Sequence, residues 1–479
     1  MTLRRAAVLC LVGVLPLFAA CGDDDSPPPA DLGVTADLGP SDAAVAVRQV
    51  TYTPEGCGYE VTSVLGRSAS LHADVIGGAP APDHLHVSFS GPATTTFAVN
   101  WRTSANDTLA SQVLYGTDQA AVTAAEGPGA GVSAQSGYSV AYERDESARV
   151  HEVHVCGLTA STRYFYKVGG AGAWSAVFDV STSPAIGTSE VWRFALTGDS
   201  RGQPDVFAET QAHIQAAGVD LEVFSGDAVT LGTDQPSWDA FFEGTSGSVS
   251  VQDVLARTPF MVSNGNHESL AVNFLAQFAV PQQVSPGEEG QGEEWYSFDY
   301  GNAHFVVLDD QADPGVIADQ ETAWLRADLT AVDRAVTPWV FAVHHMPAYT
   351  SSTAHGPALE LRASWQPLYD EFGVDLVLNG HNHGYERSAP IRGFVAGTTD
   401  GAIQPAGPNG IPLAANGTVY IVSGGSGAPL YDVAPLTPST IISESTYHYV
   451  ILELEGKTLR YHAYRLDGSD LDVFEYTRP

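Results

Sequence analysis

The sequence predicts an all-β sandwich domain followed by an α/β domain. Between about residues 49 and 186, short runs rich in β-branched and aromatic residues alternate with turn-rich segments, a pattern typical of an antiparallel sandwich. From about residue 187 to residue 479, strand-like runs alternate with helix-like segments, and polar residues follow several of the runs. A chain of 479 residues has room for two domains with sizeable cores.

The first 21 residues have the features of a targeting segment. Arg4 and Arg5 precede an apolar run over residues 6–20, which is too short for a membrane-spanning helix. The run ends in a stretch that resembles a bacterial lipobox, with Cys21 as the lipidated residue. Phe18 stands where leucine is commoner, which leaves ordinary secretion open. We expect an extracytoplasmic lipoprotein, in the periplasm or on the outer-membrane surface, held to the membrane by its lipid.

The segment 22–48 is rich in Asp, Pro and Ala and contains no aromatic residue, so we expect a disordered tether. Cys10 would leave with the signal peptide and Cys21 would carry the lipid. Cys57 and Cys156 then remain as an even pair in an oxidising compartment, and we expect a disulfide between them. Two buried thiols are the alternative.

The charge balance argues against two classes of partner. The chain has 56 acidic and 21 basic residues, for a formal net charge of −35. Such a chain offers no basic face to nucleic acid or to anionic lipid, so we expect no nucleic-acid binding.

The first domain should contain several strands that pair across two sheets. The expected strands cover residues 94–102, 111–115, 150–156 and 163–168. Tyr164, with its neighbours, resembles the tyrosine-corner region of a fibronectin-type sandwich. Histidines in this domain are expected to be surface or strand residues and not metal ligands; they are His72, His84, His86, His151 and His154.

The second domain should alternate strands and helices before it returns to strands. A helix is expected over 204–217, because Pro204 stands at its start and Gly218 just past its end. Further helices are expected over 318–329 and 359–372. The expected strands cover residues 191–197, 221–225, 260–263, 304–308, 339–343, 374–378, 418–422, 447–454 and 459–464.

Five polar stretches each follow one of these strands, where open α/β sheets place their ligands. They are Gly198-Asp199, Gly226-Asp227, Gly265-Asn266-His267-Glu268, His344-His345-Met346-Pro347 and Gly380-His381-Asn382-His383-Gly384-Tyr385-Glu386-Arg387. In this order they resemble the motifs of the calcineurin-like metallophosphoesterases. The last stretch resembles the purple acid phosphatase branch of that family.

The resemblance implies a catalytic domain in which two β-sheets pack as a sandwich flanked by helices, preceded by a fibronectin III-like domain. It also implies two divalent or trivalent metal ions, with Fe, Zn or Mn as candidates. Asp227 would bridge the ions. Asp199 and His383 would complete the first site; the second would use Asn266, His345 and His381. His344 would face away from the metals, because neighbouring strand residues point to opposite faces.

Two positions depart from the family pattern. Thr230 stands where purple acid phosphatases have a tyrosine that binds ferric iron and gives the colour, so we expect no purple colour. Arg201 stands where the wider family has a histidine ligand. Its planar guanidinium suits bidentate contact with phosphate, although a surface ion pair is an equal alternative.

The function predicted from this resemblance is metal-dependent hydrolysis of phosphoric monoesters, with a hydroxide held by the metals as nucleophile. His267, oriented by Glu268, is the first candidate to protonate the leaving group, and His355 is the second. Two alternatives remain at this stage. One is a phosphodiesterase or nucleotidase of the same family. The other is a surface-binding lipoprotein with weak catalysis, favoured by Thr230 and Arg201.

Overall fold

The computed structural model describes residues 46–141, 148–282, 292–394, 401–411 and 416–478. The expected signal peptide, Cys21 and most of the expected tether lie outside the described residues. Residues from Ala46 onward belong to one compact unit. Within the described ranges, no helix combines the length and the apolar character needed to cross a bilayer.

The N-terminal region is β-rich and consists of two main sheets. One sheet has the order β3 (Ser68–Leu71), β8 (Tyr138–Ala141), β9 (Arg149–Val155), β5 (Phe97–Thr103), β4 (Pro82–Ser88). The other has the order β11 (Ala173–Trp174), β10 (Arg163–Gly170), β6 (Gln112–Gly116), β7 (Ser133–Ser136), with β12 (Phe178–Ser181) also paired to β10. A small ribbon pairs β1 (Thr51–Tyr52) with β2 (Val61–Thr62), and α1 (Gln119–Ala124) starts at the N-cap Asp118.

The expected disulfide is present between Cys57 and Cys156, which are separated by 99 residues in the sequence. The histidines of this region are strand residues in part, as expected, but of the five only His72 is partly exposed. His86 and His151 are fully buried, and His84 and His154 are nearly so. The rings of His86, His151 and His154 form hydrogen bonds in the interior; for example, His151 lies within hydrogen-bond distance of both Thr103 and Ser111. The ring of His84 has no hydrogen-bond partner among the described residues.

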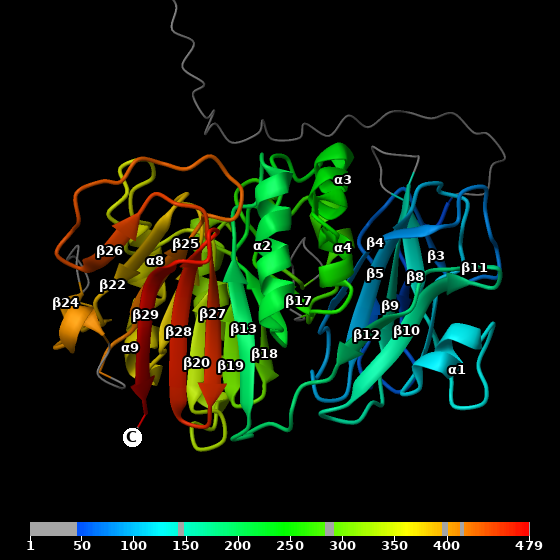
Figure 1. Ribbon diagram of the computed structural model, residues 1–479, viewed down its shortest axis with the longest axis horizontal. Helices are drawn as coiled ribbons and strands as arrows, with labels where there is room; N and C mark the ends of the chain where they lie inside the picture. The colour runs from blue at the N-terminus through cyan, green and yellow to red at the C-terminus, as the bar shows by residue number, and fades with distance from the viewer. Residues whose placement is uncertain (1–45, 142–147, 283–291, 395–400, 412–415, 479) are drawn as a thin grey trace, which may run out of the picture. The chain divides into compact units, whose positions relative to one another are not determined.

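Two larger sheets form the catalytic region (Figure 1). The first has the order β17 (Phe260–Val262), β14 (Leu221–Phe224), β13 (Val191–Thr197), β27 (His448–Glu455), β28 (Thr458–Arg465), β29 (Asp470–Thr477). The second has the order β18 (Tyr296–Tyr300), β19 (Ala303–Val307), β20 (Trp339–Val343), β21 (Leu376–Asn379), β25 (Val419–Ser423), β22 (Tyr385–Ser388), β26 (Thr440–Glu444).

The strands that precede the predicted motifs are parallel to their neighbours. β13, β14 and β17 run parallel in the first sheet, as do β19, β20, β21 and β25 in the second. The sheets pack against each other through aromatic side chains: the ring of Phe194 lies 5.3 Å from that of Phe305 and 5.4 Å from that of Phe341. The carboxyl ends of the parallel strands therefore bring their polar loops to one edge of the sandwich.

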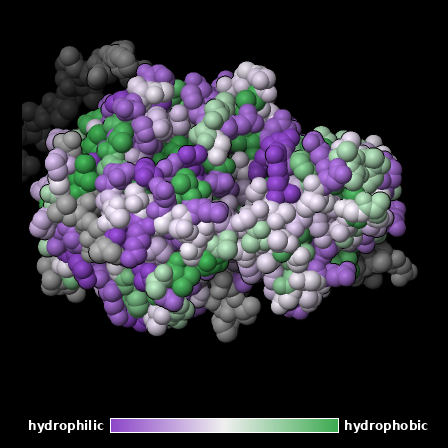
Figure 2. Space-filling view, turned by 60° about the horizontal axis from the view of Figure 1, so that its bottom comes forward, coloured by the Kyte–Doolittle hydropathy of each residue, from purple (hydrophilic) through white to green (hydrophobic). Residues whose placement is uncertain are grey.

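Helices flank the sheets, as the resemblance implies. They are α2 (Pro204–Ala217), α3 (Gln235–Glu243), α4 (Val251–Leu255), α5 (Val272–Gln277), α6 (Pro314–Val316), the π-helix η1 (Ile317–Glu321), α7 (Thr322–Ala331), α8 (Leu359–Ser364), α9 (Gln366–Phe372) and the 3₁₀-helix η2 (Pro408–Gly410). Short strand pairs join β15 (Thr245–Ser246) to β16 (Val249–Ser250) and β23 (Ile391–Arg392) to β24 (Ala402–Ile403). On the face seen in Figure 2, hydrophobic residues lie in small groups among hydrophilic ones.

Two expected helices differ from the observed ones. The single helix expected over 359–372 is two helices that meet at Trp365, because Pro367 lacks an N–H group and is accommodated in the first turn of α9. The helix expected from residue 318 is helical from Pro314, since proline suits the first position of a helix. Among the strands of the two catalytic sheets, β18, β22, β26 and β29 were not expected.

Candidate active site

Two buried carboxylates lie at the ends of neighbouring parallel strands. Asp199 follows β13 and Asp227 follows β14, and their side chains are almost fully buried. Both residues have left-handed backbone conformations, with φ of 56° and 60°. Such conformations are costly for a residue with a side chain and tend to occur at functional sites. The backbone here is held so that both carboxylates point to the same space.

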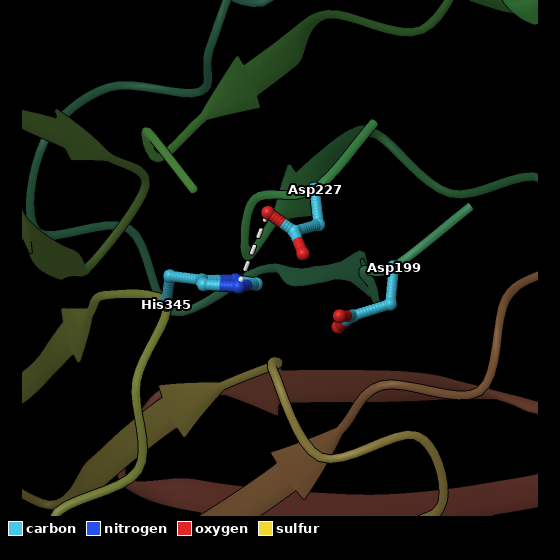
Figure 3. A group of neighbouring side chains, drawn as sticks. All are labelled: Asp199, Asp227 and His345. Carbon is cyan, nitrogen blue, oxygen red and sulfur yellow. Dashed lines mark ion pairs between the residues drawn. The ribbon is translucent and has the colours of Figure 1, made fainter. Parts of the chain in front are cut away.

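His345 joins the two carboxylates from the second sheet (Figure 3). Its Nε2 lies 3.3 Å from Oδ1 of Asp227, and the three side chains together form a group whose ligand atoms lie close enough to hold one metal ion. Its Nδ1 lies 2.8 Å from the carbonyl oxygen of Ser225, to which it can donate. That hydrogen bond would leave Nε2 as the free electron-pair donor of the ring, as metal-binding histidines require.

Asn266 and His381 complete this side of the site. Oδ1 of Asn266 lies 3.1 Å from Nε2 of His345 and 3.0 Å from Nδ1 of His381. The backbone N–H of His381 donates to both carboxylate oxygens of Asp199, at 3.1 and 2.9 Å. His381 itself has a φ of 67°, so a third proposed ligand has a left-handed backbone.

His383 approaches from the other side. Its Nε2 lies 3.6 Å from Oδ1 of Asp199, and its Nδ1 lies 2.7 Å from the carbonyl oxygen of Pro429. The ring stacks on Tyr431 with 4.1 Å between centroids, and the backbone N–H of Tyr431 donates to the carbonyl of His383. The loop that carries Tyr431 therefore fixes the orientation of His383.

Arg201 lies beside both groups of donors. Its Nε is 3.5 Å from Oδ2 of Asp227, and its Nη2 is 3.3 Å from Nε2 of His383. The side chain is 11% exposed, and within the described residues Nε has no hydrogen-bond partner. The surface ion pair considered from sequence is therefore not what the structure shows: the guanidinium lies in the site.

His267 lies on the Asp227 side and is partly exposed. Its backbone N–H donates to Oδ1 of Asp227 at 3.0 Å, its Nδ1 lies 2.7 Å from the carbonyl oxygen of Thr230, and its Nε2 is 3.8 Å from Oδ2 of Asp227. Glu268 does not orient this ring, contrary to expectation. Its buried carboxylate accepts backbone N–H groups of Asp227, Val229 and Gly265, so it holds two ligand loops together.

His355 lies on the opposite side, next to His381. The centroids of these two rings are 4.3 Å apart, and Nε2 of His355 lies 3.1 Å from the hydroxyl of Tyr431. His344 faces away, as expected from its place next to His345: it packs against Trp365, and its Nδ1 lies 3.3 Å from Oδ2 of Asp310.

Burial and mutual charge shift the pKa values of this cluster. Burial, together with the charge of Asp227, raises the pKa of Asp199 to about 8. Burial also opposes the ionisation of Asp227, but the charge and hydrogen bond of His345 outweigh it and lower the pKa of Asp227. Burial lowers the pKa of His345, yet the charge of Asp227 prevails and raises it to about 10. A bound metal cation would supply the positive charge that the proton on His345 otherwise provides beside Asp227.

Comparison with known proteins places these motifs in a family. Residues 82–182 match the model of the purple acid phosphatase N-terminal domain, and residues 193–385 match that of the calcineurin-like phosphoesterases. Purple acid phosphatase 18 of Arabidopsis thaliana is 31% identical to this chain over 344 residues, which cover 70% of this chain and 71% of the relative. The chain belongs to the purple acid phosphatase family.

Other relatives agree with this placement. Purple acid phosphatase 22 of Arabidopsis thaliana is 30% identical over 336 residues, covering 68% of this chain and 70% of that protein. The structure of a purple acid phosphatase from yellow lupin (Lupinus luteus) seeds shares the fold, with a TM-score of 0.69 and 20% identity over 83% of this chain and 75% of its own. The chain is therefore a metal-dependent phosphoric ester hydrolase.

The residues of this phosphatase fit a dinuclear metal centre, which the family implies. The donors are carboxylate and amide oxygens and imidazole nitrogens, which suit Fe, Zn or Mn. Burial and the charge of Arg201 lower the pKa of His383 to about 4, and burial, with the charge of His345, lowers the pKa of His381, so both rings are neutral at pH 7 and able to bind a metal. Two carboxylates buried side by side are stabilised by a cation between them.

Two features of the phosphatase site were not predicted from its sequence. Tyr431 contacts both His355 and His383, yet it follows His383 by 48 positions in a loop without a motif. The role of Glu268 in joining the two loops depends on its burial, which its position next to His267 does not reveal.

Proposed function

We propose that this phosphatase hydrolyses phosphoric monoesters at a dinuclear metal centre, and that Asp227 would be the ligand shared by the two ions. Asp199 and His383 would serve one ion, and Asn266, His345 and His381 the other. The contacts support this division, because His383 approaches Asp199, whereas His345 and His381 both approach Asn266. The convergence of these donors from five separate loops is the observation that carries the proposal.

When bound, the metal pair would act as a Lewis acid and lower the pKa of an attacking water molecule. The protein's own residues supply the rest. Arg201, whose Nε has no hydrogen-bond partner within the described residues, is placed to bind a phosphoryl oxygen, and charge-assisted hydrogen bonds of this kind are strong. His267 and His355 flank the donors on two sides and are the candidates to give a proton to the leaving oxygen.

The test is metal-dependent turnover of a monoester against a diester. The protein would be stripped of metal, reloaded with Mn, Zn, Fe or mixtures, and assayed on p-nitrophenyl phosphate and bis(p-nitrophenyl) phosphate. Asp227→Asn should reduce monoester hydrolysis by more than about a hundredfold, since even residues that only support metal ligands contribute 10–100-fold. The exposed Asp319→Asn is the matched control.

Preference for the bis-ester would reject the monoesterase proposal in favour of a diesterase. Metal binding without turnover of either ester would instead favour the binding lipoprotein considered from sequence. The iron-loaded protein should also lack a visible tyrosinate-to-iron absorption band, because Thr230 has no phenolate; observing that band would contradict the proposed ligand set.

We also propose that residues 49–186 form a fibronectin III-like domain and residues 187–479 the catalytic domain. The backbone N–H of Thr159 donates to the hydroxyl of Tyr164 at 3.0 Å, which supports a tyrosine corner. An experimental structure with a different strand order in this region would reject the proposal.

Membrane attachment through Cys21 is a further proposal. The apolar run before Cys21 and the disulfide between Cys57 and Cys156 support an oxidising, extracytoplasmic location. The wild-type protein should fractionate with bacterial membranes, and Cys21→Ser should be released. Membrane association that survives this substitution would contradict lipidation.

A further inference from the structure

A pocket with a volume of about 270 Å³ borders the proposed metal site on its Arg201 side. We call it the side pocket. Arg201 and Thr230 both line it, so the two positions at which the sequence departs from the family pattern face the same space. Ser200 and Ala228, which directly follow Asp199 and Asp227, also line it. The side pocket is therefore continuous with the loops that carry the carboxylates.

The outer walls of the side pocket are largely apolar. They come from α2 and α3 and include Pro204, Phe207, Pro236 and Phe241. The rings of Phe207 and Phe241 are stacked with 4.9 Å between centroids, and both are buried. A stacked, buried pair of this kind forms a rigid floor whose shape does not depend on a ligand.

Charge also distinguishes the two ends of the side pocket. The guanidinium of Arg201 lies at the inner end, beside Asp227 and His383. Asp234 also lines the side pocket, and its carboxylate accepts hydrogen bonds from the N–H and hydroxyl of Ser237, at 3.0 and 2.6 Å. An anion is thus favoured beside Arg201, and a second anionic group is disfavoured beside Asp234.

The space on the other side of the site is much smaller. The pocket bordered by His383 and Tyr431 has a volume of about 20 Å³, which is room for about one water molecule. Drug-sized ligands occupy pockets of roughly 300–1,000 Å³, so the side pocket suits a smaller group. Of the two pockets, the side pocket can hold the part of an ester that is attached to phosphate.

We propose that the side pocket binds the organic group of the phosphate ester and selects a compact apolar group about the size of one ring. The inference rests on the monoesterase function proposed above and adds to it the site and character of the leaving group. His267 bonds to the carbonyl of Thr230, on the side pocket's edge, whereas His355 lies on the far side with Tyr431. With the organic group in the side pocket, the leaving oxygen faces His267. His267, and not His355, then donates the proton to the leaving oxygen.

The test compares a ring-sized with a minimal organic group in the metal-loaded full chain. Phenylphosphonate and methylphosphonate, which cannot be hydrolysed at the carbon–phosphorus bond, serve as binding probes in calorimetry; phenyl and methyl phosphate serve as substrates. Burying one ring in a pocket that stays open to water on one side increases the binding affinity by about tenfold. We expect phenylphosphonate to bind about tenfold more tightly than methylphosphonate.

Ala240→Trp tests the place of binding. Ala240 is exposed on α3 and lines the side pocket, so an indole ring there would fill the space without a change in the core. The phenyl-to-methyl ratio should fall about tenfold, both in binding and in kcat/KM. The matched control is Ala216→Trp, because Ala216 is exposed on α2 and does not line the side pocket. It should keep the wild-type ratio.

The outcomes separate this inference from the function on which it rests. An equal affinity for both phosphonates, or a ratio that Ala240→Trp leaves unchanged, would overturn the role of the side pocket even in an active phosphatase. Failure of the metal-loaded wild type to hydrolyse either ester would reject the monoesterase function, while the phosphonate ratio would still decide whether the pocket binds a ring.

Discussion

At the scale of single residues, the site depends on glycines that leave room for charged groups. A Cβ atom added at Gly380 would lie 2.3 Å from Oδ2 of Asp199 and 2.9 Å from Oγ of Ser225. Contacts this short force the neighbouring atoms to move, and Asp199 is already fixed by the backbone of His381. The close approach of this loop to Asp199 therefore requires glycine between β21 and His381.

We predict that Gly380→Ala displaces Asp199 and weakens metal binding by about tenfold or more, because a shift of the supporting groups of a metal site typically has that effect. Metal content after dialysis against a competing chelator would measure it. Gly315→Ala is the control, since a Cβ there would have no described atom within 4 Å. Equal metal retention by the two variants would contradict the steric argument.

The proposed metal donors could be predicted from sequence because each lies two to four residues after the end of a strand and belongs to a short motif. The structure brings Asp199, Asp227, Asn266, His345, His381 and His383 together. Tyr431 could not be predicted, since its contacts depend on how a later loop folds back over His383. Local spacing identifies groups that a motif presents, but not groups that reach the site from a distant loop.

At the scale of secondary-structure elements, a buried histidine links β18, β19 and α7. His304 lies 2.7 Å from a carboxylate oxygen of Asp299 and 2.7 Å from one of Asp328. Burial lowers the pKa of His304, but its hydrogen bonds to the two carboxylates outweigh this and raise the pKa to about 9. A histidine in the unfolded chain titrates near 6.5. The folded state therefore binds this proton more tightly than the unfolded state.

The sign of the pH effect follows from that difference. The stabilisation by protonated His304 is fully present below about pH 6.5 and is lost as the pH rises through about 9. It amounts to roughly 2–3 kcal/mol, the lower value allowing for the exposure of Asp299. We predict that His304→Gln lowers the free energy of unfolding by this amount at pH 6, and that the difference shrinks by pH 9.5.

Urea unfolding of both proteins at the two pH values would check this, and Asp328→Asn should reproduce part of the loss at pH 6. A difference between wild type and His304→Gln that stays constant from pH 6 to 9.5 would show that the contribution is packing and not charge.

A second link joins β22 to the C-terminal strand β29. Arg387 is almost fully buried and pairs with both carboxylate oxygens of Asp472, which also accepts from the hydroxyl of Tyr385 at 2.7 Å. Removing one partner of a buried pair leaves an uncompensated charge and typically costs about 3–5 kcal/mol. We predict that Asp472→Ala destabilises the catalytic region by about this much in chemical denaturation.

The exposed pair Arg326–Glu371 provides the comparison, because each of its side chains is about half exposed. Exposed pairs contribute about 0–1 kcal/mol, so Glu371→Ala should change the unfolding midpoint little. If the two variants were equally stable, the Arg387–Asp472 pair would not hold β29 in place.

These elements also show where local sequence signals end. Most of the expected strands lie within one or two residues of an observed strand, because apolar alternation and turn residues mark them. β22 was treated as part of a polar motif, since Glu386 and Arg387 are charged residues that are buried only because Ser351 and Asp472 pair with them. Burial of charge through distant partners has no local signature in the sequence.

At the scale of the whole molecule, pairing between distant segments decides the architecture. β27 pairs with β13, so Glu453 lies beside Arg193 across a sequence separation of 260 residues. The C-terminal segment thereby completes the sheet whose opposite half carries Asp199 and Asp227 (Figure 1). The presence of these strands was predictable from apolar alternation, but their register and partners depend on the assembled core.

The disulfide closes the longest covalent loop among the described residues, from Cys57 to Cys156. A cross-link over about 100 residues restricts the unfolded chain and typically contributes about 2–5 kcal/mol. We predict that a phosphine reductant, which avoids the metal chelation of thiols, lowers the thermal midpoint of the β-rich region by several degrees. The phosphate-releasing activity at 25 °C should persist, because neither cysteine lies among the motif loops.

The double variant Cys57→Ser/Cys156→Ser should have the lower thermal midpoint without any reductant, and added reductant should not change that midpoint. If reductant lowered its midpoint equally, the effect would come from the metals and the disulfide would carry none of the stability assigned to it.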